Sequence, residues 1–404
     1  MERNEPMTEN MDLQDQITKL SEEYLGTVRA YRHHLHMHPE LSFEEYKTSA
    51  YIQETLERHG MEVTSGIAGT GLMVRLVGKG AGKVVALRAD MDALPIQETN
   101  EVSYRSMNDG VMHACGHDVH SSSLMGAALI LNQLKEKWTG EVRIIFQPGE
   151  ERLPGGASLM IAEGVLTNPD VDVILGQHVF PELPSGMVGF KPGMYMASAD
   201  EIYLKVKGKG GHGAMPHLNI DPVLISAHVL TALQQVVSRR AKATTPSVLS
   251  FGSIHGNGST NVIPDEVKIE GTFRTFDEAW RDEAHRHIEQ IAKGTAQSMG
   301  GDCEVKILKG YPYLMNHETL TARCTASAER YLGKEHVVEL PLRMTAEDFA
   351  YYSHEVPACF YRLGTAGKNG QFKDSVHTST FDIDEDALIT GMGLMAFLAT
   401  ELLK

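Results

Sequence analysis

Apolar runs of strand length alternate with helical segments along most of this 404-residue chain, and this alternation constrains the fold more than any other feature. Four such runs are predicted to be buried strands, at residues 71–77, 83–89, 141–146 and 171–176. Helices are predicted over residues 118–137 and 157–165. Strands that alternate with helices favour an α/β fold, with a mixed, mostly parallel sheet flanked by helices on both faces.

Helical patterns come before this region, and the same α/β pattern resumes near the carboxyl terminus. Helices are predicted over residues 11–38 and 42–60, the second with a capping box in which Ser42 is followed three residues later by Glu45. The resumed pattern predicts a helix at 318–332, a strand at 358–364 and a closing helix at 384–403. The first domain is therefore expected to be discontinuous.

Between these parts the order of elements changes to βαββαβ. The predicted elements are strand 199–207, helix 221–240, strands 247–254 and 267–275, helix 277–299 and strand 302–309. This order is that of a ferredoxin-like α+β unit, which closes on itself and reads as an insertion. We expect a catalytic metal-binding domain formed by residues 1–196 and 312–404, and an inserted lid or dimerisation domain at 197–311.

Composition excludes several classes of partner. The formal net charge is −16 and no basic cluster could follow a phosphate backbone, so nucleic acid is not expected as a partner. No run of about 18 apolar residues indicates a membrane span, and residues 1–10 lack the apolar core of a signal peptide. The four cysteines are sparse and unpatterned, as in a reducing compartment. We therefore expect a cytoplasmic protein.

The segment His113–His120 places one thiol, three imidazoles and a carboxylate within eight residues. Imidazole and thiolate suit a borderline-soft divalent metal, and carboxylates can complete its site. Cys115 and His117 can face one metal or bracket two, while His178 and His377 follow apolar runs. A polar loop with hydrogen-bonded histidines is the alternative. The recurrence of donors where strands end, at the usual ligand crevice of open α/β sheets, favours metal.

Two adjacent carboxylates, Glu150 and Glu151, follow the predicted strand 141–146. Because neighbouring residues point in different directions, one can bind metal while the other takes a proton from a metal-activated water and carries it to a leaving nitrogen. A solvated turn is the alternative for this pair. Asp90 and Asp92 can bind metal or accept a ligand's ring N–H, and we assign the second role to Asp92. This pattern predicts a hydrolase.

Other histidines have weaker signals. Four of them, His33, His34, His36 and His38, lie on the first predicted helix and are expected to be surface or packing residues. Residues 208–213 match the dinucleotide pattern G-x-G-x-x-G, but that fingerprint needs a helix at its third glycine, and the helix here is delayed to about residue 221. We expect this loop to present His212 to a substrate instead.

Six motifs occur in order along the chain: Leu87-Arg-Ala-Asp-Met-Asp-Ala-Leu-Pro95, His113-Ala-Cys-Gly-His-Asp118, Gln147-Pro-Gly-Glu-Glu151, Gly210-Gly-His-Gly-Ala-Met-Pro216, Asn261-Val-Ile-Pro264 and Glu347-Asp-Phe349. Together they resemble the di-metal amidohydrolases that include hippurate hydrolase, bacterial aminoacylases and plant indole-acetyl-amino-acid hydrolases, within the glutamate carboxypeptidase-like clan. The resemblance covers nearly the whole chain. It implies two divalent ions, Mn²⁺ or Zn²⁺, with Ni²⁺ or Co²⁺ as alternatives.

The resemblance also implies roles for individual residues. The implied metal ligands are Cys115, His117, Glu151, His178 and His377. Cys115 would bridge the metals, where the wider clan has an aspartate, and Glu150 would be the general base. His212 would stabilise the oxyanion, and Asn261 or Arg274 would hold the substrate's carboxylate.

We therefore predict a metal-dependent amidohydrolase that cleaves N-acyl amino acids to a carboxylate and a free amino acid, by metal-activated water with a glutamate base. The expected partners are this small-molecule substrate and a second copy of the chain, in a homodimer or higher homo-oligomer. A metallo-carboxypeptidase or dipeptidase is the alternative among enzymes, because a peptide is also an N-acylated amino acid. A non-catalytic metal- or ligand-binding protein is the alternative from another class.

Overall fold

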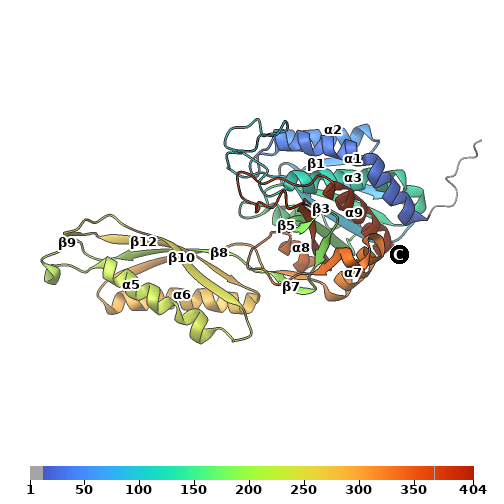
Figure 1. The fold of residues 1–404 in the computed structure, drawn as a ribbon. Helices are drawn as coiled ribbons and strands as arrows, with labels where there is room; N and C mark the ends of the chain where they lie inside the picture. The colour runs from blue at the N-terminus through green and yellow to red at the C-terminus, as the bar shows by residue number, and fades with distance from the viewer. Residues whose placement is uncertain (1–11, 368) are drawn as a thin grey trace, which may run out of the picture. The chain divides into compact units, whose positions relative to one another are not determined.

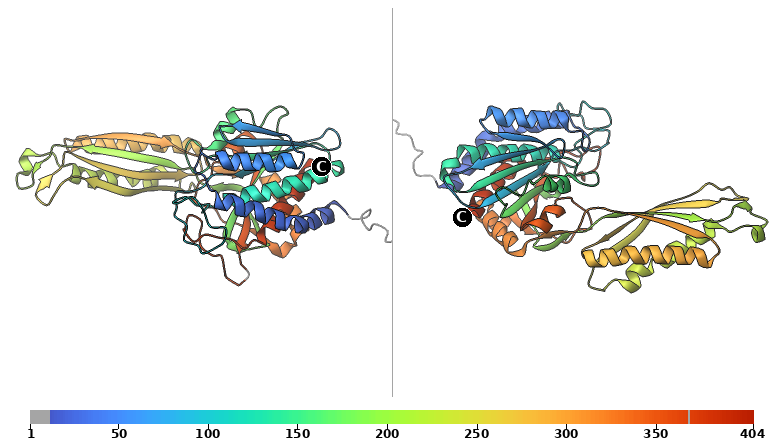
Figure 2. Two further views of the ribbon diagram at one scale, coloured as in Figure 1. Left: turned by 90° about the horizontal axis from the view of Figure 1, so that it is seen from above. Right: turned by 180° about the vertical axis from the view of Figure 1, so that it is seen from behind.

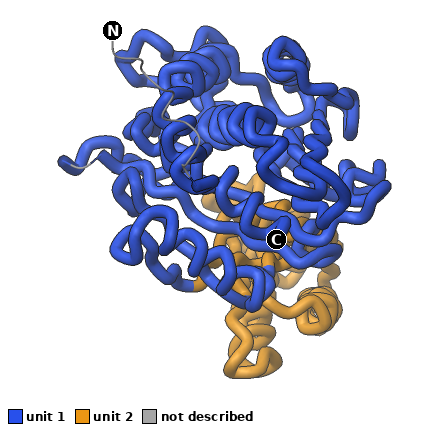
Figure 3. Tube along the Cα trace, turned by 90° about the vertical axis from the view of Figure 1, so that its right-hand side faces the viewer, with its two compact units in different colours: residues 1–193, 315–341, 351–404 blue, residues 194–314, 342–350 orange. Residues whose placement is uncertain are grey.

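The computed structural model describes residues 12–367 and 369–404, and its contacts group the chain into two compact units, coloured separately in Figure 3. Unit 1 comprises residues 1–193, 315–341 and 351–404, and unit 2 comprises residues 194–314 and 342–350. The first predicted helix boundary and the amino-terminal segment used to predict localisation lie outside the described residues. Within the described ranges, no helix is long and apolar enough to cross a membrane.

The boundaries of unit 2 lie close to the predicted 197–311, with one addition. Unit 2 also takes in residues 342–350, which the sequence analysis assigned to the catalytic domain. The reason is backbone pairing, because the N–H of Arg343 donates to the carbonyl of Tyr195 at 2.9 Å and its own carbonyl accepts from Ala197 at 3.2 Å. The catalytic and lid roles of the two units stay predictions.

Unit 1 is built on an eight-stranded sheet. Its strands are β1 (Val63–Ile67), β2 (Gly71–Val77), β3 (Val84–Asp90), β4 (Glu141–Gln147), β5 (Val173–Pro184), β6 (Val188–Phe190), β15 (Val337–Glu339) and β16 (Ala358–Ala366). Their order is β1-β2-β4-β3-β5-β16-β6-β15. The four central strands β4, β3, β5 and β16 are parallel, whereas β2 pairs antiparallel with β1 and β4. The predicted mixed, mostly parallel sheet is confirmed.

Helices cover this sheet. They are α1 (Leu13–Met37), α2 (Tyr46–Arg58), α3 (His117–Gln133), α4 (Gly156–Ala162), α7 (Glu318–Leu332), α8 (Ala350–Glu355) and α9 (Ala387–Leu403). Every residue of β3, β4 and β16 is buried. Because successive side chains of a strand point to opposite faces, complete burial means that both faces of the central sheet are covered. The largest apolar core of the chain lies here and includes residues of α1, α3 and α9.

Unit 2 is a ferredoxin-like βαββαβ unit, as predicted. Its elements are β8 (Asp200–Lys207), α5 (Pro222–Leu233), β10 (Ser247–Gly256), β12 (Glu266–Thr275), α6 (Glu278–Ser298) and β13 (Asp302–Lys309). The sheet order is β10-β12-β8-β13, with all pairs antiparallel. Residues of β8 alternate between buried and partly exposed, and α5 and α6 both cover one face of the sheet (Figures 1 and 2). The predicted helix 221–240 ends early, at Leu233, and a π-helical turn at Val236–Arg240 follows it.

Short elements complete the chain. They are the paired strands β7 (Gly193–Met196) and β14 (Leu314–Asn316), the paired strands β9 (Gly211–His212) and β11 (Val262–Ile263), and the 3-10 turns Lys135–Lys137, Pro216–Leu218 and Lys334–His336.

A buried ion pair joins one end of the unit 2 sheet, where β8 begins and β13 ends, to α6. Asp200, at the start of β8, accepts hydrogen bonds from Nε of Arg281 at 2.9 Å and from His285 at 2.6 Å. Arg281 also donates to the carbonyl of Gly310, just after β13, at 3.0 Å. Burial would raise the pKa of Asp200, but the hydrogen bonds from His285 and Arg281 outweigh it and hold this pKa below its usual value of 3.8.

Asp200→Asn is expected to destabilise unit 2 by about 3 kcal/mol at neutral pH, because it removes the buried carboxylate that pairs with Arg281 and leaves the guanidinium with only the partly exposed Glu278 as an ionic partner. Since the pKa of Asp200 is lowered on folding, its contribution is fully present above the unfolded pKa and is lost as the pH falls through the folded pKa. Urea unfolding followed by circular dichroism should show a gap between wild type and variant at pH 7 that narrows below about pH 4. A gap that stays constant in acid would contradict this assignment.

Candidate metal centre and active site

The predicted metal donors lie in unit 1, most of them on loops or at the ends of regular elements. Asp90 ends β3, Glu150 and Glu151 follow β4, and Cys115 and His117 stand at the start of α3. His178 does not end its strand as predicted. Strand β5 continues to Pro184 along β16, although its pairing with β3 stops at Gly176, so His178 lies where β5 extends past β3.

Gly116 allows the metal loop to turn into helix α3. It caps the helix in the left-handed conformation with φ +81°, which favours glycine. A Cβ at this position would also come within 2.7 Å of the side chain of Val179. The glycine between Cys115 and His117 is therefore what places a thiol and an imidazole on either side of a tight turn.

The donors form two triads that both contain Cys115. One triad is Cys115, His117 and His178, and the other is Cys115, Glu151 and His377; within each, the possible ligand atoms all lie within 4.8 Å of one another. The Sγ atom of Cys115 is 3.5 Å from Nε2 of His178, and Oε1 of Glu151 is 3.2 Å from Nε2 of His377. The structure thus brings together all five predicted ligands.

The rings of two histidines are oriented by bonds at Nδ1. His178 donates from Nδ1 to the carbonyl of Val179 at 2.8 Å, and Nδ1 of His117 is 3.1 Å from Oδ1 of Asp92. Both histidines therefore direct Nε2 toward the triads. Oδ2 of Asp92 accepts in turn from the hydroxyl of Ser42 at 2.6 Å and from the N–H of Glu151 at 2.9 Å. Asp92 so occupies the hydrogen-bonding position that the sequence analysis assigned to it.

The donor set fits divalent cations. Nε2 of His117 is buried and makes no hydrogen bond among the described residues, although it lies 3.9 Å from Glu151. Burial, together with Glu151, Glu150 and Asp90, raises the pKa of the Cys115 thiol well above 9.0. Burial would lower the pKa of His117, but Asp90 and Asp92 outweigh it and raise this pKa to about 10. Carboxylates thus contribute to the raised pKa of two of the five donors, whereas burial lowers the pKa of His178, and a cation bound here would neutralise the local negative charge of these carboxylates.

Two nearby groups belong to a different network. Nδ1 of His120 bonds Oδ1 of Asp90 at 2.6 Å, and its Nε2 accepts from the N–H of Val179 at 2.8 Å. Both ring nitrogens are thus in use, so His120 is not available as a metal ligand. Asp90 also accepts from Arg88 at 2.6 Å. The structure therefore gives Asp90 a charge-pairing role beside the triads.

Glu150 lies next to the triads. Its carboxylate forms a cluster with His117 and Glu151 in which possible ligand atoms lie within 4.8 Å of one another, and the residue is only 6% exposed. A solvated turn, the alternative considered for Glu150-Glu151, is therefore wrong for Glu150. The turn depends on Gly149, whose φ is +59° and whose Cβ would collide with the ring of Phe43.

The predicted lid residues lie in unit 2, at two separate places. His212 pairs with Val262 across β9 and β11, and the carbonyl of Asn261 accepts from Gly213 at 2.8 Å, so His212 and Asn261 are neighbours. Arg274 lies near the end of β12, where it donates to the carbonyl of Met344 at 3.1 Å.

The length of β12 separates the two places. Gly210 donates to Asp265, just before the start of β12, at 2.9 Å, so the His212 loop lies at that end of the strand. From there to Arg274 the strand extends about 26 Å, at about 3.3 Å per residue. Within one chain, Arg274 is therefore not brought together with His212 and Asn261.

Several hydrogen bonds around the site were not predicted from the sequence. Ser42 and Glu45 do not form the predicted capping box: α2 begins at Tyr46 with no side-chain cap, Ser42 bonds Asp92, and Glu45 accepts from the N–H of Gly149 at 2.8 Å. His36, expected at the surface or in packing, is buried and bonds both Asp118 and Glu98. The i,i+4 spacing of Arg32 and His36 places both on one face of the helix, but no sequence signal indicated that this face is buried against carboxylates.

Comparison with known proteins gives consistent results. The model for peptidase family M20/M25/M40 matches residues 86–401. The chain is 45% identical over 304 residues to N-acyl-L-amino acid amidohydrolase from Geobacillus stearothermophilus, covering 75% of this chain and 82% of that protein. It is 37% identical over 392 residues to thermostable carboxypeptidase 2 from Saccharolobus solfataricus, covering 96% of this chain and 98% of that protein. Among solved structures, the chain is similar to the crystal structure of Bacillus subtilis YXEP protein, described as a dinuclear metal binding peptidase from the M20 family. The TM-score is 0.81 and the sequence identity 34%, and the match covers 95% of this chain and 99% of that protein.

Proposed function

Because this chain belongs to peptidase family M20/M25/M40 and is an amide-bond hydrolase, we propose that it cleaves N-acyl amino acids into a carboxylate and a free amino acid. The observation that carries the proposal is the pair of donor triads that share Cys115, with the buried carboxylate of Glu150 beside them. The similarity to an N-acyl-L-amino acid amidohydrolase supports this substrate class.

We propose that one divalent cation is held by Cys115, His117 and His178, and a second by Cys115, Glu151 and His377. Mn²⁺ or Zn²⁺ fits a set of thiolate, imidazole and carboxylate, and Ni²⁺ or Co²⁺ is also compatible. Such cations would supply Lewis acidity, which polarises the amide carbonyl and makes water a better nucleophile. The similarity to a dinuclear metal binding peptidase supports two cations rather than one.

The protein's own residues transfer the proton of the attacking water and bind the negative charges of the oxyanion and of the substrate's carboxylate. Glu150 takes a proton from the attacking water and delivers it to the amine nitrogen as the C–N bond breaks. Nδ1 of His212 accepts from the N–H of Ala214 at 3.1 Å, which leaves Nε2–H as a donor for the oxyanion. Arg274 or Asn261 would hold the substrate's carboxylate.

We also propose that a second copy of the chain takes part. Because Arg274 lies far along β12 from His212 and Asn261, all three can act on one small substrate only if two copies contribute. Unit 2 exposes a group of large apolar side chains, each about half exposed, namely Met215, Leu218, Val223, Leu224, Ile254 and Val262. A homodimer that covered these side chains would remove their apolar surface from water, which favours association. Light scattering that finds a monomer at working concentrations would contradict this part of the proposal.

A panel of N-acetyl and N-benzoyl amino acids and free-amine dipeptides, offered to metal-loaded protein, tests the substrate class. We expect kcat/KM to be highest for an N-acyl amino acid. A higher kcat/KM for dipeptides would favour the carboxypeptidase or dipeptidase alternative, which the similarity to thermostable carboxypeptidase 2 supports. Tight metal binding without turnover of any member would favour a non-catalytic binding protein.

A further inference from the structure

His377 differs from the other proposed ligands in how it is held. His178 lies within a strand and His117 begins a helix, whereas His377 follows β16 on a loop and its side chain is 51% exposed. Its φ is +65°, a left-handed conformation that is unfavourable for a residue with a side chain. Its N–H donates to the carbonyl of Ala114 at 2.8 Å, which ties it to the metal loop at one point. The position of His377 therefore depends on what holds the loop beyond it.

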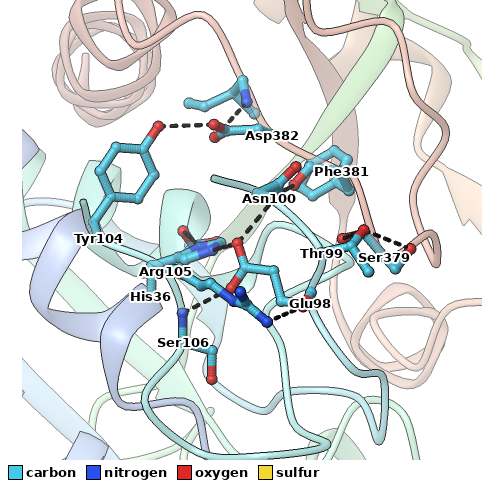
Figure 4. A network of polar contacts seen from close by, with 12 residues as sticks. His36, Glu98, Thr99, Asn100, Tyr104, Arg105, Ser106, Ser379, Phe381 and Asp382 are labelled. Carbon is cyan, nitrogen blue, oxygen red and sulfur yellow. Dashed lines mark hydrogen bonds and ion pairs between the residues drawn. The ribbon is translucent and has the colours of Figure 1, made fainter. Parts of the chain in front are cut away.

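The segment Glu98–Ser106, here called the strap, is bonded to that loop. The N–H of Thr99 donates to the carbonyl of Ser379 at 2.9 Å, and the amide of Asn100 donates to the carbonyl of Phe381 at 3.1 Å. Figure 4 shows these contacts at close range. All of the bonded positions lie within five residues of His377.

The strap and the loop are also fixed by side chains. The hydroxyl of Tyr104 in the strap donates to Oδ2 of Asp382 at 2.7 Å, and the other oxygen of Asp382 accepts from Arg32 of α1 at 2.6 Å. Arg32 also donates to Asp118, the residue after His117, at 3.0 Å. The guanidinium thus joins the loop that carries His377 to the helix that carries another proposed ligand.

The strap itself is anchored at its first residue. Oε1 of Glu98 lies 3.2 Å from Nε2 of the buried His36, and Oε2 accepts from the N–H of Ser106 at 2.7 Å. Because both ends of the strap are tied to Glu98, its shape is fixed independently of any substrate. A rigid support of this kind preorganises a ligand that its own loop does not restrain.

We infer that the strap, through Thr99, Asn100 and Tyr104, is a positioning element for His377, and that it sets the affinity of the metal position formed by Cys115, Glu151 and His377. The inference rests on the proposed di-metal function. The other metal position uses His117 and His178, which Asp92 and the backbone orient without the strap. Weakening the strap should therefore loosen one metal and spare the other.

The double variant Asn100→Ala/Tyr104→Phe tests the inference. It removes the donors to Phe381 and Asp382 but keeps the aromatic ring, which stacks on His33. Metal-free proteins would be titrated with Mn²⁺ in a calorimeter, and the bound metal counted by mass spectrometry. We expect one site to lose affinity on the order of tenfold, the same site that His377→Ala weakens, with the other site unchanged within about twofold.

The matched control is Tyr31→Phe, which removes an α1 hydroxyl bonded to His59 outside the strap. Saturating Mn²⁺ should restore kcat in the double variant, because a positioning residue does not touch the substrate. If the double variant does not fold, Tyr104→Phe alone should still show about a threefold loss at the site that His377→Ala weakens. Equal losses at both sites, or no loss at either, would overturn the inference.

His377→Ala separates failure of this inference from failure of the proposed function. If wild type binds fewer than two metals, or if His377→Ala keeps both at wild-type affinity, the metal assignment itself is wrong. If His377→Ala loses one metal while the double variant binds both as wild type does, the assignment stands and only the role of the strap is refuted.

Discussion

Glu150→Gln is expected to lower kcat by about a thousandfold, while two metal ions per chain remain bound. Glutamine has nearly the shape of glutamate, so the turn after β4 and the neighbouring ligand Glu151 should keep their places. It cannot accept a proton from water and carry it to the leaving amine. The measurement is steady-state turnover of the best N-acyl amino acid at saturating metal, with metal content determined on the same sample.

Glu136→Gln is the control for this change. Glu136 is exposed on a short turn after α3 and takes no part in the donor triads, so the same chemical substitution should leave kcat unaltered. A Glu150→Gln enzyme within tenfold of wild-type kcat would rule out Glu150 as the general base. Loss of metal together with activity would instead mean that Glu150 acts mainly as a ligand.

Cys115→Ala should remove both metals rather than one. Cys115 belongs to both triads, so its loss takes one donor of three from each position. Loss of a group that only supports a ligand costs about 10- to 100-fold in affinity, so loss of a shared ligand should cost at least about 100-fold at each position. Mass spectrometry after dialysis against buffer without metal should find fewer than one ion per chain, and activity should fall below detection.

Two further variants serve as controls for Cys115→Ala. Cys303→Ala changes a buried thiol in unit 2 and should keep both metals. His178→Ala removes a donor from a single triad and should lose one metal only. If Cys115→Ala keeps one tightly bound ion, the thiolate serves a single position, and the bridging role implied by the sequence resemblance is refuted.

The regular elements could be predicted because their periodicity is strong. Strand 71–77, helix 318–332 and strand 302–309 have the predicted bounds. Short strands such as β6 and β15 were missed, since three residues contain too little periodicity to be recognised. The continuation of β5 beyond His178 was missed because its pairing with β16 is a long-range contact.

The proposed ligands could be picked out because thiol, imidazole and carboxylate donors are dense at residues 113–120 and recur after apolar runs of the sequence. The hydrogen bonds that hold the ligands in place could not be predicted, because they join residues that are far apart in the sequence. Ser42 and Glu45 have the spacing of a capping box, but they bond Asp92 and Gly149, far away in the sequence. The separation of His212 from Arg274 follows from the length of β12, which no motif records.

The ferredoxin-like unit is also separable in evolutionary terms. Its first and last strands, β8 and β13, are direct neighbours, with Asp200 opposite Lys309, so the βαββαβ segment 200–309 begins and ends at one place, although residues 342–350 also belong to unit 2. A short turn could replace everything between them without disturbing the eight-stranded sheet, and domain insertions succeed where the ends of the inserted part lie close together. Descendants of such a protein could lengthen or exchange this module while they keep the donor triads of unit 1, and a descendant that lost it would have to replace His212, Asn261 and Arg274.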